Sequence, residues 1–374
     1  MKTQQNYEEI LFPLVITFFS LVLFFLPTGF ENTMDTSRAF RTKAVVLGTD
    51  NSDLQKQGML VIGSQVLQLQ ILKGRYKGQI VESHNLLNGQ LIYDRIYLTG
   101  DRVLAVGNVG KNQKITSLRA IDIYRLNTEI VLFILFAAYL IFFARWTGFK
   151  ALISFIFTAL AIWKILIPSF LHGVQPLMIS FLIVCILTTV IILLISGFNK
   201  KGLVALTGSI AGVALTTLLA IIFGFYFRIP GTAREFSEVL LYSGYAHLNL
   251  SDIFIAGIFI SAAGAVMDVA MDIAASQNEI VIKKPDIAKV ELIKSGFNIA
   301  SPVIGTMTTT LLFAYSGSFI FIFMVFMAKG TPVNYIFNIN FIAAEILHTL
   351  VGSFGLVLVA PATAIIGGFV FPAK

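Results

Sequence analysis

Long apolar runs make up most of the chain and are interrupted by one polar stretch over residues 30–127. The first run, residues 10–28, is about long enough to cross a hydrocarbon core of roughly 30 Å. Glu8 and Glu9 precede it, and the PTGF that ends it has no small-x-small cleavage site. This pattern predicts a retained anchor helix within residues 1–29 rather than a removed signal peptide.

Residues 30–127 contain short apolar runs separated by Gly, Asn and Asp. These runs include KAVVLG, MLVIG, QVLQLQILKG and DRVLAVGNVG. Such runs predict five to seven short strands. Strands of this length in so small a domain favour a closed or half-closed barrel of the SH3 or OB type, which removes exposed edges. The basic stretch from Lys73 to Gln79 predicts a tight hairpin turn. It is either a solvated loop or a site for anionic polymer or lipid.

From residue 128 to 374 the pattern predicts a helical bundle, with helices near 128–145, 150–170, 175–197, 202–227, 252–275, 297–317 and 346–371. The fold class is therefore an α-helical integral membrane protein of about eight transmembrane helices, with a small β-barrel-like domain outside the cytoplasm. The apolar piece 318–328 is too short to span alone. It fits a half-helix lining a binding site, the bent end of the preceding helix, or an interfacial turn.

Composition and charge agree with a membrane protein. Hydrophobic residues form 56% of the chain and charged residues 13%, against about 25% charged in soluble domains. The net charge of +7 invites a nucleic-acid partner, but the basic residues gather in short loops on one predicted side of the bundle. Eight lie on that side against Arg228 and Arg234 on the other: Arg145, Lys150, Lys200, Lys201, Lys283, Lys284, Lys289 and Lys294. We therefore predict a plasma or inner membrane protein with a cytoplasmic N-terminus, residues 30–127 outside, and no nucleic-acid partner.

The strongest candidates for chemistry are Asp268 and Asp272, which lie four residues apart and hence on one helical face. Gly264 and Ala265 lie one turn earlier and form a stripe of small residues that allows a close helix contact. A carboxylate within a membrane span costs on the order of 2.5–3.5 kcal/mol and almost always faces the bundle interior. We predict that at least one of the two is protonated near neutral pH and couples ions or protons. In the structural alternative, Asp272 pairs with Lys283 or Lys284.

The next predicted helix is rich in hydroxyl and small side chains, and Pro302 can open its hydrogen-bond ladder. We predict a polar path that runs beside the two aspartates, although single threonine hydroxyls in membrane helices more often bond their own backbone. The candidate residues of this path, with the Glu-x-x-His pair that opens the last helix, are Asn298, Ser301, Gly305, Thr306, Thr308, Thr309, Glu345 and His348.

Other motifs limit the function. The Glu345-x-x-His348 pair resembles half of a di-metal site, but the chain has only four histidines, so we predict no metal. Gly208 and Gly212 form a GxxxG pair and predict helix packing. No Walker loop, dinucleotide fingerprint, GxSxG or HExxH occurs. We predict no enzymatic activity and no cofactor.

Three segments resemble the YibE/F-like family of bacterial membrane proteins: GAVMDVAMD from Gly264, GTMTTTLLFAYSG from Gly305, and the last helix from Glu345 to Leu358. The resemblance spans nearly the whole chain and implies a multi-helix membrane protein of largely undefined activity. The family pattern often has Asn at Thr309 and Arg at His348, so a relay through His348 is not general to the family. A weaker analogy, at the level of fold, is to proton-driven exporters of the resistance-nodulation-division type.

These observations favour a proton- or ion-coupled secondary transporter or export accessory factor. The alternative is a non-transporting scaffold whose outer β-domain binds an envelope partner. The expected partners are the lipid bilayer, an envelope protein or polymer at the outer domain, and a paralogous membrane subunit or a second copy of the chain.

Overall fold

The computed structural model describes residues 2–30, 39–110 and 113–371. The chain folds into two units. One consists of Met1–Thr28 together with Leu140–Lys374, and the other is Gly29–Tyr139. The predicted beginning of the outer domain adjoins residues 31–38, which lie outside the described residues.

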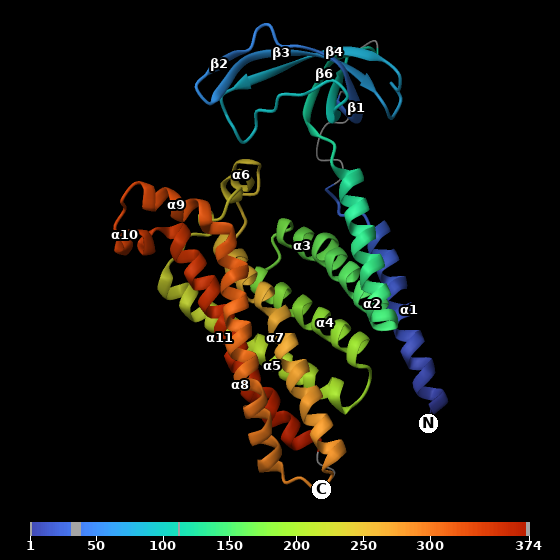
Figure 1. Cartoon of the computed structure of the whole chain (residues 1–374), viewed down its shortest axis with the longest axis vertical. Coiled ribbons are helices and arrows are strands. Elements are labelled where there is room, and N and C mark those ends of the chain that lie inside the picture. The colour runs from blue at the N-terminus through green and yellow to red at the C-terminus, as the bar shows by residue number, and fades with distance from the viewer. Residues whose placement is uncertain (1, 31–38, 111–112, 372–374) are drawn as a thin grey trace. The chain divides into compact units, whose positions relative to one another are not determined.

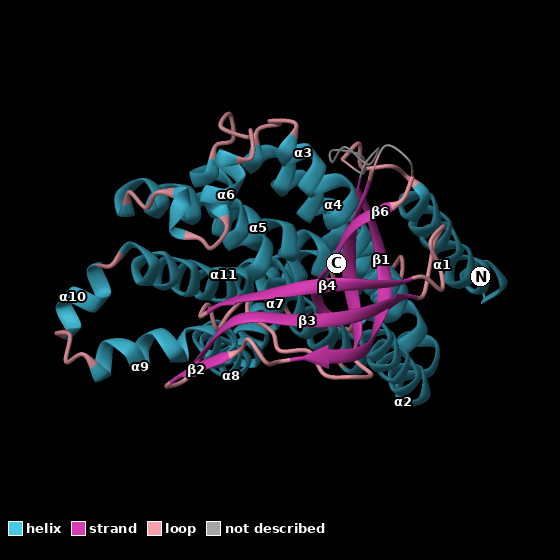
Figure 2. Ribbon diagram, turned by 90° about the horizontal axis from the view of Figure 1, so that it is seen from above, coloured by secondary structure: helices cyan, strands magenta, loops and turns pink. Residues whose placement is uncertain are grey.

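The Gly29–Tyr139 unit is built on a six-stranded sheet (Figures 1 and 2). Its strands are β1 (Ala39–Asp50), β2 (Gln55–Gln57), β3 (Leu60–Ile71), β4 (Ile80–Asn88), β5 (Arg102–Val109) and β6 (Ile115–Ile123). The strand order is β2-β3-β1-β5-β6, with β4 on the other side of β3, and every pairing is antiparallel. β4 also approaches β6, so the sheet curves into a half-barrel.

Alternating side chains of these strands fill the half-barrel, as period-two burial requires. Leu67 and Leu69 of β3 pack with Val103 of β5 and with Tyr97 from the loop before it, and all four are almost fully buried. The stretch from Lys73 to Gln79 forms the predicted hairpin turn between β3 and β4. The turn is closed by a hydrogen bond in which the Gly78 amide donates to the Ile71 carbonyl at 2.8 Å.

A buried glutamine holds the loop before β5 onto the sheet. Gln65 is fully buried, and its Nε2 donates to the Tyr97 carbonyl and to Asn51 Oδ1, both at 2.8 Å. Its Oε1 accepts from the Tyr97 amide at 3.0 Å and from Asn85 Nδ2 at 3.2 Å. Both ends of the amide are therefore satisfied, as a buried polar group requires. Burial raises the pKa of the Tyr97 phenol to about 12.

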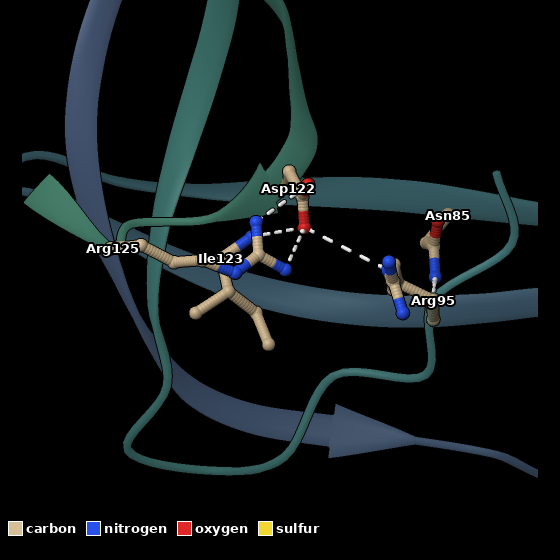
Figure 3. Close-up of polar contacts among 5 residues, drawn as sticks. All are labelled: Asn85, Arg95, Asp122, Ile123 and Arg125. Atoms are coloured by element: carbon tan, nitrogen blue, oxygen red, sulfur yellow. Dashed lines mark hydrogen bonds and ion pairs between the residues drawn. The ribbon is translucent and has the colours of Figure 1, made fainter. Parts of the chain in front are cut away.

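A charged cluster lies where the chain leaves β6 (Figure 3). Asp122 accepts from both terminal nitrogens of Arg125, at 2.8 and 3.0 Å, and Arg95 Nε lies 3.8 Å from it. The hydrogen bond from Arg125 is the main reason that the pKa of Asp122 falls below its usual value. Asn85 donates to the Arg95 carbonyl at 2.6 Å, so the cluster continues into the polar group around Gln65.

The remaining elements are helices. They are α1 (Lys2–Phe25), α2 (Leu126–Ala161), the π-helical turn η1 (Ile162–Leu166), α3 (Ile167–Leu171), α4 (Pro176–Ser196), α5 (Lys200–Phe227), the turn η2 (Gly231–Ala233), α6 (Ser237–Tyr242), α7 (Leu250–Lys283), α8 (Lys289–Ser316), the turn η3 (Gly317–Phe319), α9 (Ile320–Ala328), α10 (Val333–Asn338) and α11 (Asn340–Val370). Among the described residues, six helical segments are long and apolar enough to cross a membrane, by length and composition.

One of the six segments, Leu126–Leu171, contains a sharp break. Arg145 leaves helical geometry with φ 49° and ψ −123°. A Cβ on Gly148 would lie 2.3 Å from the Leu140 carbonyl oxygen, so the chain turns tightly here and needs glycine for the close approach. This break falls between the predicted helices 128–145 and 150–170.

Helix α7 lies at the centre of the bundle and packs against α4, α5, α8 and α11. Side chains such as Phe259, Val266 and Ile273 are fully buried there. Gln277, near the end of α7, is also fully buried, and its Nε2 donates to the Leu292 carbonyl of α8 at 3.2 Å and to the Ala364 carbonyl of α11 at 3.0 Å. Three helices thus meet at one amide.

Both ends of the bundle carry distinct features (Figure 1). The beginning of α1, the end of α11, and the α4–α5 and α7–α8 turns lie at one end, while α6, α9 and α10 lie at the other. α9 has nine residues and leads away from the end of α8, at an angle to it, toward α10 (Figures 1 and 2). Residues 318 and 319 therefore belong to the turn η3, residues 320–328 form a separate short helix, and no side chain of α9 is buried.

Candidate functional site

A charged network joins three parts of the bundle at the end that carries α6. Arg234 follows η2, and its Nη1 donates to Glu345 Oε2 of α11 at 3.1 Å. Its Nη2 bonds His348 Nδ1, also at 3.1 Å, and its guanidinium lies 5.2 Å from the centre of the Phe254 ring. The Glu345 and His348 side chains are only 12% and 14% exposed. A charged pair this deep in an apolar bundle depends on its hydrogen bonds for stability.

His348 connects this network to α7 and α8. Its Nε2 lies 2.5 Å from Ser261 Oγ, and its ring packs on Tyr315 of α8 with 4.3 Å between ring centroids. The Ser261 hydroxyl donates to the Ile258 carbonyl at 2.8 Å. One imidazole therefore contacts α7, α8 and the Arg234 loop.

Donor chemistry limits the roles of the two imidazole nitrogens. Arginine can only donate, so Nδ1 is the acceptor in the contact with Arg234. Nε2 then carries the N–H and faces Ser261 Oγ.

Ser261 also belongs to a narrow exposed stripe along α7. The stripe consists of Gly257, Ser261, Gly264, Asp268 and Asp272, and the residues between its members are mostly buried. It contains no large apolar side chain. From Ser261 to Asp272 it extends about 16 Å at 1.5 Å per residue. The two predicted aspartates are therefore continuous along one helix face with the His348 network.

Neither aspartate has an ion pair among the described residues. The alternative partner Lys284 pairs instead with Glu291 of α8, at 2.9 Å. An exposed pair of carboxylates in a long apolar helix requires water, an ion or another protein surface beside it, because lipid cannot solvate them.

Most residues of the predicted polar path are exposed on α8. Asn298, Ser301, Gly305, Thr306 and Thr309 are exposed, and Thr308 is half-buried. The threonine hydroxyls bond carbonyls of their own helix: Thr306 to Pro302 and Val303, Thr308 to Ile304, and Thr309 to Gly305. This is the ordinary behaviour of threonine in apolar helices. Their hydroxyls are therefore already committed as donors.

The predicted packing residues differ in their surroundings. A Cβ on Gly208 would lie 2.2 Å from Thr363 Oγ1, and one on Gly212 would lie 2.6 Å from the Val359 Cβ, so α5 and α11 pack closely at both. Ala265 packs against the bundle core, but a Cβ on Gly264 would meet nothing within 4 Å. Within the described part of the chain, no group of three or more His, Cys, Asp or Glu side chains is placed to hold a metal.

Sequence reasoning missed the residues that complete the network. The sequence pattern gives Arg234 only as a loop charge and Tyr315 only as a member of a motif. A cation in a loop between two apolar helices was the available signal, because such a charge needs a partner when the loop folds onto the bundle. Gln277 offered a similar indication, because it is a polar amide that lies four residues after the apolar Ile273 on the same helix face.

The fold and site define a helical bundle of long apolar helices joined to a small half-barrel. The sequence model of YibE/F-like proteins matches residues 132–373, and that of the YibE/F family N-terminal domain matches residues 31–122. The chain belongs to the YibE/F-like family, as its motifs predicted. No curated protein and no solved structure matches it.

Proposed function

We propose that the chain is a proton- or ion-coupled secondary transporter, or an export accessory factor, of the cell membrane. The observation that supports this is the continuity of the His348 network with the Asp268–Asp272 stripe through Ser261. Titratable groups inside apolar helices are costly and mark ion pathways. Here Asp268 and Asp272 follow Ser261 along α7, which packs against α4, α5, α8 and α11.

We propose a specific topology as well. A helix of 46 residues would be about 69 Å long, far more than the roughly 30 Å of a hydrocarbon core. The break at Arg145 therefore separates two crossings. With α1, α4, α5, α7, α8 and α11 the crossings number about eight. The eight basic residues of the predicted cytoplasmic loops support a topology in which those loops face the cytoplasm and the half-barrel lies outside.

The test is carbodiimide labelling of the purified full-length protein from pH 5 to 9, with modified residues identified by mass spectrometry. Carbodiimides react with protonated carboxyls in apolar sites. We expect Asp268 or Asp272 to react near neutral pH and to lose reactivity as the pH rises. Asp286, exposed in the α7–α8 turn, is the internal control and should stay unreactive at neutral pH.

If neither aspartate reacts until the protein is unfolded, both are ionised or sealed, and the coupling role is lost. A second test uses Asp268→Asn, with Asp252→Asn at the beginning of α7 as a matched control. The proposal requires Asp268→Asn to insert and fold while abolishing function. A variant that only lowers stability supports a structural role for the aspartates.

A separate observation in the half-barrel favours the alternative function, that of a non-transporting scaffold. A cavity of about 630 Å³ lies along β4, β5 and β6 and is lined by Glu82, His84 and Arg119 among others. Under this second proposal, an envelope partner binds there. Lesions at Arg119 would then abolish function, and Asp268→Asn would leave it intact.

A further inference from the structure

A second cavity lies beside the Arg234 network, in the bundle unit. Its volume is about 580 Å³, which is within the range of small-molecule sites. The walls are mainly apolar and come from the α6 region and the beginning of α7: Phe236, Leu240, Leu250, Ile253 and Phe254. Arg234 and His348 also line it, so an apolar space has at one end a guanidinium that is paired with Glu345.

Arg234 has donors to spare at that end. A guanidinium carries five N–H groups, and the contacts with Glu345 and His348 use two of them. The side chain is 35% exposed, so the remaining donors are accessible. Phe254 supports the guanidinium from one face, which fixes its direction. Glu235 lines the cavity too, but it is exposed, where water solvates its carboxylate.

We infer that this cavity binds an amphiphile with one apolar chain and a carboxylate or phosphate head. The chain lies among the apolar walls, and the head accepts hydrogen bonds from Arg234. Arginine suits either head group because its planar fork matches their oxygens. Binding at equilibrium requires no transport, so this inference goes beyond the proposed function and does not depend on it.

Gly257 gives a means to close the cavity without disturbing the fold. It lines the cavity from α7, and a Cβ on it would meet nothing within 4 Å. Gly257→Leu therefore places a side chain in the space that the ligand would occupy. Gly317→Leu is a matched control, because a Cβ at Gly317, after α8, also meets nothing within 4 Å and lies outside the cavity.

The experiment is a scintillation proximity assay with tritiated laurate on the full-length protein in amphipol. Unlabelled dodecyl phosphate, lysophosphatidic acid and dodecanol serve as competitors. We expect saturable binding, competition by dodecyl phosphate, and competition by dodecanol that is at least about tenfold weaker. Lysophosphatidic acid competing better than both free amphiphiles would identify a lipid head group as the natural source. Free amphiphiles competing equally well or better would identify a soluble one.

Gly257→Leu should weaken laurate binding at least about tenfold, and Gly317→Leu should bind as the wild type does. Arg234→Gln should weaken laurate binding and leave dodecanol unchanged. The inference is overturned if Gly257→Leu and Gly317→Leu bind laurate equally, or if dodecanol competes as well as dodecyl phosphate. Because these readouts need no gradient, they are independent of the outcome for Asp268.

Discussion

Two fully buried glutamines, one in each unit, differ in how completely their side-chain amides are hydrogen-bonded. Gln65 in the half-barrel has partners at both ends of its amide: two acceptors for Nε2 and two donors for Oε1. Gln277 in the bundle has two carbonyl acceptors for Nε2, but its Oε1 is buried with no partner among the described residues. The first amide is saturated, and the second is half-satisfied.

The backbone around each residue explains the difference. Gln65 bonds a loop, where the Tyr97 amide and carbonyl have no ladder partner and depend on the side chain. Gln277 bonds carbonyls within α8 and α11 that helical amides already satisfy. Gln65 therefore satisfies backbone groups that have no other partner among the residues that the structure describes, whereas Gln277 bonds carbonyls that already accept from helical amides. Burial alone does not measure how much a polar side chain stabilises a fold.

The largest expected effect is that of Gln65→Met, which keeps the side-chain length and removes the amide. It leaves the Tyr97 backbone groups and Asn85 Nδ2 buried and incompletely bonded, at about 1–3 kcal/mol for each group, and we expect a loss of about 3 kcal/mol. Hydrogen–deuterium exchange of β3, β4 and the loop before β5 would measure it. Gln68→Met, on the exposed face of β3, is the control. Equal protection in the two variants would contradict the comparison.

Gly367→Ala should come next. A Cβ there would lie 2.0 Å from Gln277 Oε1, and the buried amide has little room to move. We expect a loss of about 2 kcal/mol, as for other overpacked cores, measured by thermal unfolding of the helical circular dichroism signal. In the background of Gln277→Ala the cost should largely disappear. Gly305→Ala, where a Cβ meets nothing within 4 Å, should not destabilise.

The Tyr97 phenol makes the stability of the half-barrel depend on pH, which gives a further test that concerns the half-barrel alone. Its folded pKa of about 12 exceeds the ordinary value of 10.0, so the folded half-barrel holds the proton that the unfolded chain releases. Stability from this group is fully present below pH 10 and is lost as the pH rises toward 12, by about 1–2 kcal/mol. Tyr97→Phe should remove this dependence, while Tyr93→Phe, at an exposed position, should retain it. Alkaline unfolding followed by exchange of β3 peptides gives the measurement.

The smallest effect should be that of Gln277→Met. The carbonyls of Leu292 and Ala364 keep their helical partners, and an unpaired buried oxygen is removed. We expect a change within about 1 kcal/mol in either direction. A loss of about 3 kcal/mol in the thermal assay used for Gly367→Ala would show that the contact of Gln277 with α8 and α11 holds the bundle together.

Local pattern predicted much of this fold, because each element has a period that the sequence displays. The described residues of the half-barrel form six strands, within the predicted five to seven, and the family resemblance is confirmed. Helix ends were less well predicted. α7 continues to Lys283 rather than ending at 275, and α8 begins at Lys289 rather than 297. Hydropathy finds only the apolar part of a helix, and both helices extend past it with polar residues.

The candidate site was predictable only in pieces. Glu345 and His348 were identified by their spacing on one helix, and Asp268 and Asp272 likewise. The contact of Arg234 with Glu345 joins residues 111 positions apart, and no periodicity encodes such a pairing. The exposure of the aspartates is a tertiary result as well, because it depends on which helices pack beside α7.

The contact between Arg234 and His348 also limits where the imidazole can take up a proton. Arginine only donates, so Nδ1 cannot be protonated while it accepts from Arg234. If the proposed coupling runs through His348, the Arg234 loop must move before that nitrogen is protonated, and Glu345 Oε2 lies 3.7 Å from it.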